Sequence, residues 1–295
     1  MALADFLSRL PFNRRNFLKG SIACAAGLAL YSSEVERHWI EVAEREIFLR
    51  ELPDAFNGFR IAQLSDIHME EFTEDYFLRD AVKRVNQLQP DIVALTGDFV
   101  SEGPRSRGFA AGAVWKCANI LNELKCRQLY AVLGNHDVGV GRRRVSAALK
   151  ANGITVLLNT FLPLERAGGR IWLAGVDDPL LGHPKLELAI PASIRNLSNQ
   201  PIVLLCHAPD YADELLNHPA GKATALMLSG HTHGGQICLP FLGPLALPDL
   251  GRKYIQGWFR LGNLQLYVNR GIGTVGVPFR IDCPPEISLF TLRKG

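Results

Sequence analysis

Five short apolar runs along this chain are each followed, within a few residues, by side chains that bind metal ions well. The runs and their donors are 59–64 before Asp66 and His68, 92–95 before Asp98, 129–133 before Asn135, 202–205 before His207, and 225–228 before His231 and His233. Runs of this length that are rich in Val, Ile and Leu are typical of buried strands. In open α/β sheets the chemistry gathers outside the carboxyl ends of the strands. The pattern therefore predicts one polynuclear metal site and an enzyme.

Strands and helices are predicted to alternate from residue 39 onward. Strand-like segments at 39–49 and 58–64 precede a helix over 73–88, and then come strand 91–96, a helix near 109–124, strand 128–133 and a helix near 142–151. This βαβα order predicts a parallel sheet. The later runs at 154–158, 171–176, 202–206, 224–228, 265–269 and 286–292 are separated by Gly- and Pro-rich turns, with one clear helix near 210–217. They predict a second, more mixed sheet packed on the first, within a single domain over 38–295.

The formal net charge of +3 is confined to the start of the chain. Four of the 32 basic residues and one of the 29 acidic residues lie in the first thirty positions, which leaves 28 of each in the remainder. A neutral body lacks the basic surface of a nucleic-acid-binding protein, so no nucleic-acid partner is expected. For the basic run 142–144, a solvated helix start is favoured over a phosphate-facing role.

Residues 1–32 have the pattern of an export signal. Arg14-Arg15 is followed by Phe17-Leu18, by Lys19, and by the apolar stretch 21–31, which is short of the roughly 18 residues that span a bilayer. This pattern is similar to the bacterial twin-arginine signal, and it implies the twin-arginine translocation machinery as a partner. A cytoplasmic amphipathic helix would not explain the uncharged stretch. The leader is compatible with cleavage, with lipidation at Cys24, or with retention as a membrane anchor. We expect the exported protein in the periplasm or on the outer face of the cytoplasmic membrane.

Five motifs in chain order carry a resemblance to a known family. They are Asp66-Ile67-His68, Gly97-Asp98, Gly134-Asn135-His136-Asp137, His207, and Gly230-His231-Thr232-His233. In this order they resemble the calcineurin-like metallophosphoesterases. The segments 234–236 and 270–273, with the leader, are similar to an exported bacterial phosphodiesterase branch of that family. The resemblance implies an α/β fold of two mixed β-sheets packed face to face and flanked by helices, in four layers.

The resemblance also implies a role for each donor. Asp98 would bridge two divalent cations, because a shared carboxylate relieves the repulsion between ions held about 3.5 to 4 Å apart. Asp66, His68 and His233 would complete one metal site, and Asn135, His207 and His231 would complete the other. A water or hydroxide shared by both ions would attack phosphorus in a phosphoester. Nitrogen and oxygen ligands without thiolate are compatible with Mn, Fe, Zn or Ni.

The local sequence suggests how these donors are presented. Asp66 and His68 are expected on an extended segment, where residues two apart face the same side. Gly97, Gly134 and Gly230 are expected to let the backbone turn tightly at the strand ends. In the family, the position of His136 is not a ligand. We expect His136 to protonate the leaving oxygen or to stabilise phosphoryl charge, with Asp137 holding its ring; a third ligand or a structural histidine is the alternative.

The substrate is less constrained than the chemistry. Ser/Thr phosphatases of this superfamily carry Asp-Arg-Gly after the Gly-Asp motif, and this chain has Phe99 to Gly103 instead, so a protein phosphatase is disfavoured. For the apolar segment 239–248, cover for the core is favoured over contact with a lipid or membrane surface. A phosphodiester or pyrophosphate substrate, lipid- or glycan-linked, is expected in the envelope, and a nucleotide-linked glycolipid is one option. The alternative is an envelope binding protein that holds a phosphorylated glycan or lipid at two metals without turnover.

Overall fold

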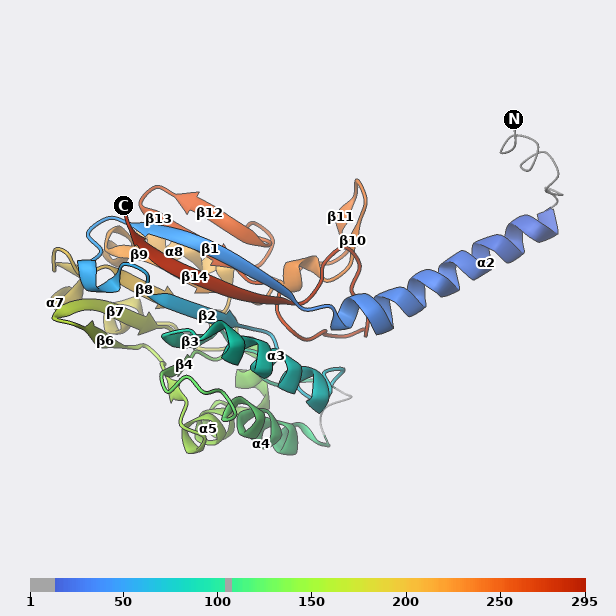
Figure 1. The fold of residues 1–295 in the computed structure, drawn as a ribbon, viewed down its shortest axis with the longest axis horizontal. Helices are drawn as coiled ribbons and strands as arrows, with labels where there is room; N and C mark the ends of the chain where they lie inside the picture. The colour runs from blue at the N-terminus through green and yellow to red at the C-terminus, as the bar shows by residue number, and fades with distance from the viewer. Residues whose placement is uncertain (1–13, 104–107) are drawn as a thin grey trace.

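Two six-stranded sheets form the centre of the protein (Figure 1). The computed structural model describes residues 14–103 and 108–295. The first sheet has the order β1 (Glu41–Leu49), β14 (Glu286–Lys294), β2 (Arg60–Leu64), β3 (Ile92–Leu95), β4 (Leu129–Ala131) and β5 (Thr155–Val156). The second has the order β12 (Gly257–Leu261), β13 (Leu264–Val268), β9 (Thr224–Ser229), β8 (Ile202–Leu205), β7 (Gly169–Gly175) and β6 (Thr160–Arg166).

Both sheets mix parallel and antiparallel pairs. In the first sheet β2, β3 and β4 run parallel, as the βαβα order predicted, and β5 extends this parallel set. Strand β14 lies between β1 and β2, parallel to β1 and antiparallel to β2. The predictions that 154–158 and 286–292 belong to the second sheet are therefore wrong, because β5 and β14 both lie in the first. Residues 286–290 are all buried. A fully buried strand has the same apolar composition in either sheet, so its sequence does not indicate which sheet it joins.

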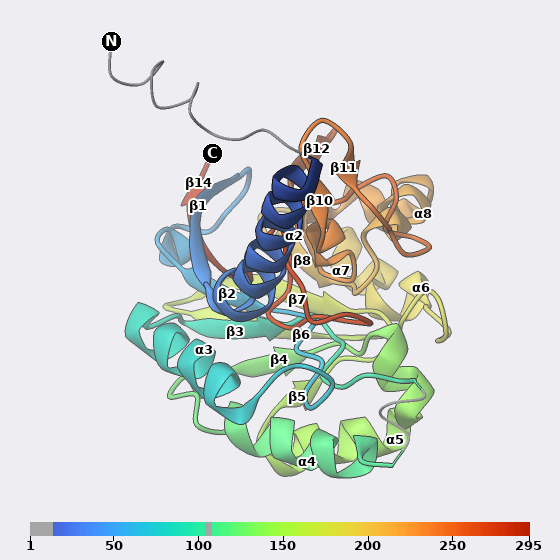
Figure 2. The same cartoon turned by 90° about the vertical axis from the view of Figure 1, so that its right-hand side faces the viewer.

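Helices cover the outer face of each sheet, so that four layers follow one another (Figure 2). The first sheet packs on α3 (Asp75–Leu88), α4 (Ala110–Leu121) and α5 (Asn135–Ala151), and the second packs on α6 (Leu186–Ala189), α7 (Ala192–Arg195) and α8 (Ala212–Asn217). Between the sheets lies a core of buried aliphatic and aromatic side chains, among them Ile61, Ile92 and Val203. The predicted arrangement of two mixed sheets flanked by helices is confirmed.

Several elements differ from the predicted ones. Helix α5 begins at Asn135, well before the predicted start near 142, and its backbone is not helical at Gly141, with φ 133° and ψ 98°. Gly139 and Gly141 are poor helix formers and interrupt the helical spacing of apolar residues, so the first turns of α5 could not be recognised from the sequence. Strands β6 and β12, helices α6 and α7, and the hairpin of β10 (Cys238–Leu239) and β11 (Gly243–Pro244) were not predicted. They are short or half-exposed, so they carry no clear period.

The N-terminal helix α2 (Arg14–Leu30) projects from the body, and all of its residues are exposed (Figure 1). It continues into η1 (Tyr31–Val35) and η2 (Glu36–His38), where Ser32, Glu36 and Arg37 are buried against the body. Among the residues that the structure describes, no helix has both the length and the apolar character needed to cross a bilayer. The first part of the predicted leader, residues 1–13, lies outside the described residues.

Candidate metal centre

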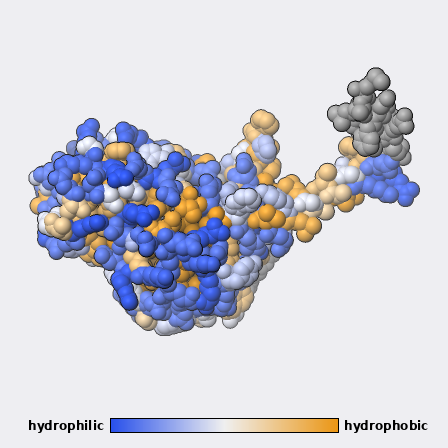
Figure 3. Space-filling model, viewed as in Figure 1, coloured by the Kyte–Doolittle hydropathy of each residue, from blue (hydrophilic) through white to orange (hydrophobic). Residues whose placement is uncertain are grey.

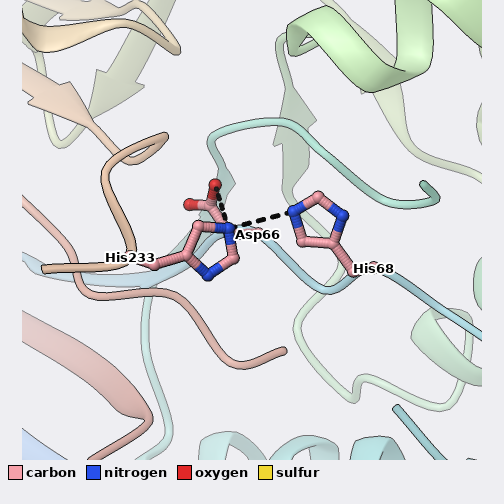
Figure 4. A group of neighbouring side chains, drawn as sticks. All are labelled: Asp66, His68 and His233. Atoms are coloured by element: carbon pink, nitrogen blue, oxygen red, sulfur yellow. Dashed lines mark hydrogen bonds and ion pairs between the residues drawn. The ribbon is translucent and has the colours of Figure 1, made fainter. Parts of the chain in front are cut away.

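The ends of strands from both sheets bring the predicted donors together. Besides His68, Asp98 and His136, two groups of three side chains each have donor atoms within 4.8 Å of one another. One group is Asp66, His68 and His233 (Figure 4), and the other is Asp98, His207 and His231. Asp66, His68 and Asp98 follow strands of the first sheet, and the remaining histidines follow β8 and β9 of the second. Each group therefore joins the two sheets.

The backbone at these donors is curled rather than extended. Five of them have left-handed backbone, with φ of 50° at Asp66, 49° at His68, 54° at Asp98, 74° at His231 and 52° at His233. Such a conformation is uncommon outside glycine and costs about 1 to 3 kcal/mol per residue, so the surrounding fold must enforce it. The predicted extended segment at Asp66 and His68 is wrong. A tight curl after each strand aims the side chains instead.

The three predicted turn glycines serve two different purposes. Gly97 has φ +96°, so it turns the chain as predicted. At Gly134 and Gly230 the requirement is space rather than a turn. A Cβ atom at Gly134 would lie 2.2 Å from Asp98 Oδ1, and one at Gly230 would lie 2.3 Å from Asp66 Oδ2. These two glycines let the backbone approach the carboxylates of the site more closely than any other residue would.

A hydrogen-bond relay fixes the proton on the ring of His68. His68 Nδ1 lies 2.7 Å from Ser101 Oγ, and the Ser101 hydroxyl donates to the Glu71 carboxylate. Because that hydroxyl proton is used on Glu71, Ser101 Oγ accepts from His68 Nδ1–H. His68 Nε2 is then the unprotonated nitrogen, and it lies 3.0 Å from His233 Nε2 (Figure 4). Two inward ring nitrogens this close together would hold a divalent ion between them.

The second group shows the same arrangement. His207 Nδ1 donates to the carbonyl of Thr96 at 2.7 Å, and His231 Nε2 donates to the carbonyl of Asp249 at 2.9 Å. The other ring nitrogens, His207 Nε2 and His231 Nδ1, face each other at 3.1 Å. Backbone carbonyls accept the distal protons, so the nitrogens that face inward are the ones that can bind an ion.

The electrostatics of the site suit cations. Burial lowers the pKa of His68 to about 3 and, together with His207, that of His231 to about 4, so both rings are neutral, as metal ligands must be. Burial also lowers the pKa of His207, but Asp98 outweighs it and raises that pKa to about 10. Burial opposes the charge on Asp98, yet His207 holds the pKa of Asp98 well below its usual range.

A buried polar atom without a partner also points to cations. Asn135, the first residue of α5, has its Oδ1 buried with no hydrogen-bond partner in the described part of the chain. A buried carbonyl oxygen without a partner is costly unless something binds it. The donor set of carboxylates, imidazoles and one amide fits divalent metals of the Mn, Fe, Zn and Ni group. The residues present therefore fit a pair of divalent cations.

The predicted contact between Asp137 and His136 is wrong. The Asp137 carboxylate accepts the backbone N–H groups of Asp98 at 2.8 Å, Phe99 at 2.9 Å and Gly134 at 3.0 Å. It thereby ties the start of α5 to the loop that carries Asp98. His136 is half-buried, and its Nδ1 accepts the backbone N–H of Glu102 at 2.9 Å. Asp137 is thus a positioning residue for Asp98 and Gly134.

Sequence reasoning missed the supports of the site. Ser101, Glu71, Thr96 and Asp249 hold the ligand rings from their outer side, and no motif in the chain points to them. Only Ser101 lies in a segment that the sequence had singled out, because residues 99–103 depart from the Ser/Thr phosphatase pattern. The apolar segment 239–248 was favoured as cover for the core. Instead Phe241, Leu242 and Leu245 are exposed by 107%, 78% and 60%.

Two known family models match parts of this chain. Residues 59–235 match the family model described as calcineurin-like phosphoesterase, and residues 11–31 match that of the twin-arginine translocation pathway signal sequence. The chain belongs to the calcineurin-like phosphoesterase family. Its members are metal-dependent phosphoester hydrolases, and the twin-arginine signal supports export across the membrane.

Two bacterial relatives match nearly the whole chain. The uncharacterized metallophosphoesterase YkuE of Bacillus subtilis is 35% identical, over 96% of this chain and 98% of its own. The phosphodiesterase YaeI of Escherichia coli is 31% identical, over 95% of this chain and 99% of its own. A putative 5'-nucleotidase from Staphylococcus aureus shares the fold, with a TM-score of 0.51 and 14% identity, over 80% of this chain and 54% of its own.

Proposed function

We propose that this protein hydrolyses a phosphodiester or pyrophosphate bond in the cell envelope, with two divalent cations. In this proposal Asp66, His68 and His233 hold one ion, Asn135, His207 and His231 hold the other, and Asp98 is shared. The position of Asp98 carries the assignment. Its Oδ2 lies 3.1 Å from His207 Nε2 and 3.7 Å from His68 Nε2, so one oxygen faces both groups. A shared carboxylate is what a pair of close cations requires.

The cations, when bound, would neutralise the phosphoryl oxygens and supply a nucleophilic water. The protein's own residues fix the rest of the geometry. Neutral rings of His68 and His231 direct their free nitrogens inward, while Ser101 and Asp249 hold the distal ones. Asp137 keeps the loop of Asp98 in place through the backbone bonds described above.

His136 completes the site as a hydrogen-bond donor in this proposal. Because Nδ1 accepts from the Glu102 backbone, the ring proton is on Nε2. A ring nitrogen of His136 lies within 4.8 Å of the donors of His68 and Asp98. Binding a metal through Nε2 would move the proton to Nδ1, against the N–H of Glu102. The contact therefore favours donation to a phosphoryl or leaving oxygen over a third ligand role.

The place of action and the substrate class are further parts of the proposal. We propose that residues 1–32 direct export, that 38–295 act as a single catalytic domain, and that this domain works in the periplasm or on the outer face of the cytoplasmic membrane. A lipid- or glycan-linked phosphodiester or pyrophosphate, such as a nucleotide-linked glycolipid, is the substrate class that suits this location. The neutral body supports a substrate other than nucleic acid.

Metal content and turnover measured together test the proposal. In Asp98→Asn the two cations lose their shared anion, so we expect most metal and most activity to disappear together. Asp177→Asn is the matched control, because Asp177 is also buried but accepts the backbone N–H of His183 and pairs with Arg142. Substrates are a phosphomonoester, bis(p-nitrophenyl) phosphate and a nucleotide-diphosphate lipid. Two tightly bound ions and normal turnover in Asp98→Asn would refute the assignment. Full metal loading of the wild type without turnover of any substrate would favour the binding-protein alternative.

A further inference from the structure

We propose that the β10–β11 hairpin docks the protein on the surface of a lipid bilayer, with Phe241, Leu242 and Leu245 among the lipids. From Ile237 to Pro248 the chain has no charged residue. In Figure 3 the tip of this hairpin is hydrophobic and stands clear of the body. Folding alone does not account for exposing such a segment, because side chains of this size are stabilised by leaving water.

The conformation at the tip keeps these side chains outward. Strands β10 and β11 pair Cys238 with Pro244 and Leu239 with Gly243, so the loop consists of 240–242. Phe241 has left-handed backbone, with φ 67°, which is unfavourable for a bulky residue. Phe241 and Leu242 are therefore held at the far end of a narrow projection, and no described part of the chain covers them.

The root of the hairpin adjoins the root of the export helix. Segment 280–283 lies between the two: Arg280 N donates to Ser32 O, and Cys283 N donates to Glu36 Oε1. On its other side Ile281 N donates to Gln236 O, and Cys238 N donates to Ile281 O. Figure 1 shows α2 and the hairpin leaving the same end of the body. The leader matches an export signal, so in the exported protein this end would be the one nearest the bilayer.

A bilayer fits this surface better than a protein partner does. Three apolar side chains offer at most about 500 Å² of contact, whereas a stable protein interface buries about 800 Å² on each partner. Insertion of a few apolar side chains with basic residues beside them is typical of interfacial membrane binding. Near the hairpin, α2 adds exposed apolar side chains, with Ile22 and Leu30 exposed by 69% and 64%, while Arg14, Arg15 and Lys19 lie toward its far end.

Docking at this end would bring lipid-linked substrates to the metal centre. The hairpin begins soon after His233, and the chain that leaves it returns to Asp249, whose carbonyl accepts from His231 Nε2. Both ends of the segment therefore join the ligand loop. The link to a lipid-linked substrate rests on the proposed function, whereas docking is a separate property of the hairpin.

Flotation with vesicles of phosphatidylethanolamine and phosphatidylglycerol tests the proposal on the full chain. In Phe241→Ser/Leu242→Ser we expect binding to weaken about a hundredfold or more, the effect of withdrawing two apolar side chains from lipid. Leu181→Ser/Leu188→Ser is the matched control, because these leucines are 52% and 51% exposed but lie elsewhere. Binding through the tip should persist at high salt, while any contribution of Arg14 and Arg15 should fall.

A depth measurement separates the hairpin from α2. In Phe241→Trp the added fluorescence should be quenched by brominated lipids, and in Leu181→Trp it should not. Equal flotation of the serine variant and the wild type, with no quenching of Phe241→Trp, would overturn the proposal. Turnover of any of the three substrates named above by the metal-loaded wild type reports the proposed function independently. Quenching without turnover would uphold docking and refute the hydrolase proposal, and turnover without quenching would do the reverse.

Discussion

Removing the Ser101 hydroxyl should weaken one metal site without unfolding the protein. Ser101 is 2% exposed, and its Oγ accepts the Nδ1 proton of His68 at 2.7 Å. In Ser101→Ala that buried N–H loses its acceptor, which costs about 1 to 3 kcal/mol. The ring can avoid this cost by moving its proton to Nε2, the nitrogen that would bind the ion. Either way the ion at Asp66, His68 and His233 should bind about 5- to 150-fold more weakly.

Competition with a chromogenic chelator would measure this affinity, one ion at a time. Ser146→Ala is the matched control, since Ser146 is also a buried serine but its Oγ has no hydrogen-bond partner within the described residues. Glu71→Gln keeps an acceptor for the Ser101 hydroxyl, so its loss should be smaller. Urea unfolding in the presence of chelator separates metal affinity from stability. Wild-type affinity in Ser101→Ala, or an equal loss in Ser146→Ala, would refute the relay.

Three further variants test other parts of the structure. If His136 stabilises phosphoryl charge, His136→Ala should retain metal and lower kcat by about 10²- to 10⁴-fold. The loss should then be the same for p-nitrophenyl esters and alkyl esters. A loss in kcat that grows with the pKa of the leaving group would instead show that His136 transfers a proton. Arg14→Lys/Arg15→Lys keeps the charge of the leader but should abolish export. Cell fractionation should then find folded, active enzyme in the cytoplasm. Unchanged export of this variant would contradict the leader assignment. Gly134→Ala should displace Asp98, since the new Cβ would lie 2.2 Å from Asp98 Oδ1, and metal analysis should show loss of both ions. Gly112→Ala is the control and should keep both ions, because nothing lies within 4 Å of a Cβ atom there.

The sequence revealed the donors because strand ends and ligands are local patterns. Each apolar run is short and bounded, and the donor follows it directly, so Asp66, Asp98 and His207 can be found without knowing how the strands pair. The four-layer arrangement was predicted through the family resemblance. The position of β14 was not, because its partners β1 and β2 are more than two hundred residues away in the chain. The apolar sequence of a buried strand does not indicate which distant strands it pairs with.

The fine geometry of the site was hidden for a different reason. Left-handed backbone at Asp66 and His68 is imposed by the surrounding fold against the preference of both residues. Asp137 follows His136 in sequence, which suggested a contact, but the first turn of α5 directs its carboxylate to the Asp98 loop instead. Ser101 and Glu71 act through side-chain bonds across loops, and single-sequence patterns do not encode such bonds.

Because each group of donors draws on both sheets, a bound ion would join the two halves of the protein. Neither group can form in a chain whose sheets have separated, so only the folded state would bind the ions tightly. At a free metal concentration 100 times the dissociation constant, each ion would then add about 2.7 kcal/mol to the free energy of unfolding. Metal supply would in this way set the lifetime of the folded enzyme as well as its activity. A metal-starved cell would hold a pool of this protein that proteases could clear, and metal repletion would protect the molecules that remain.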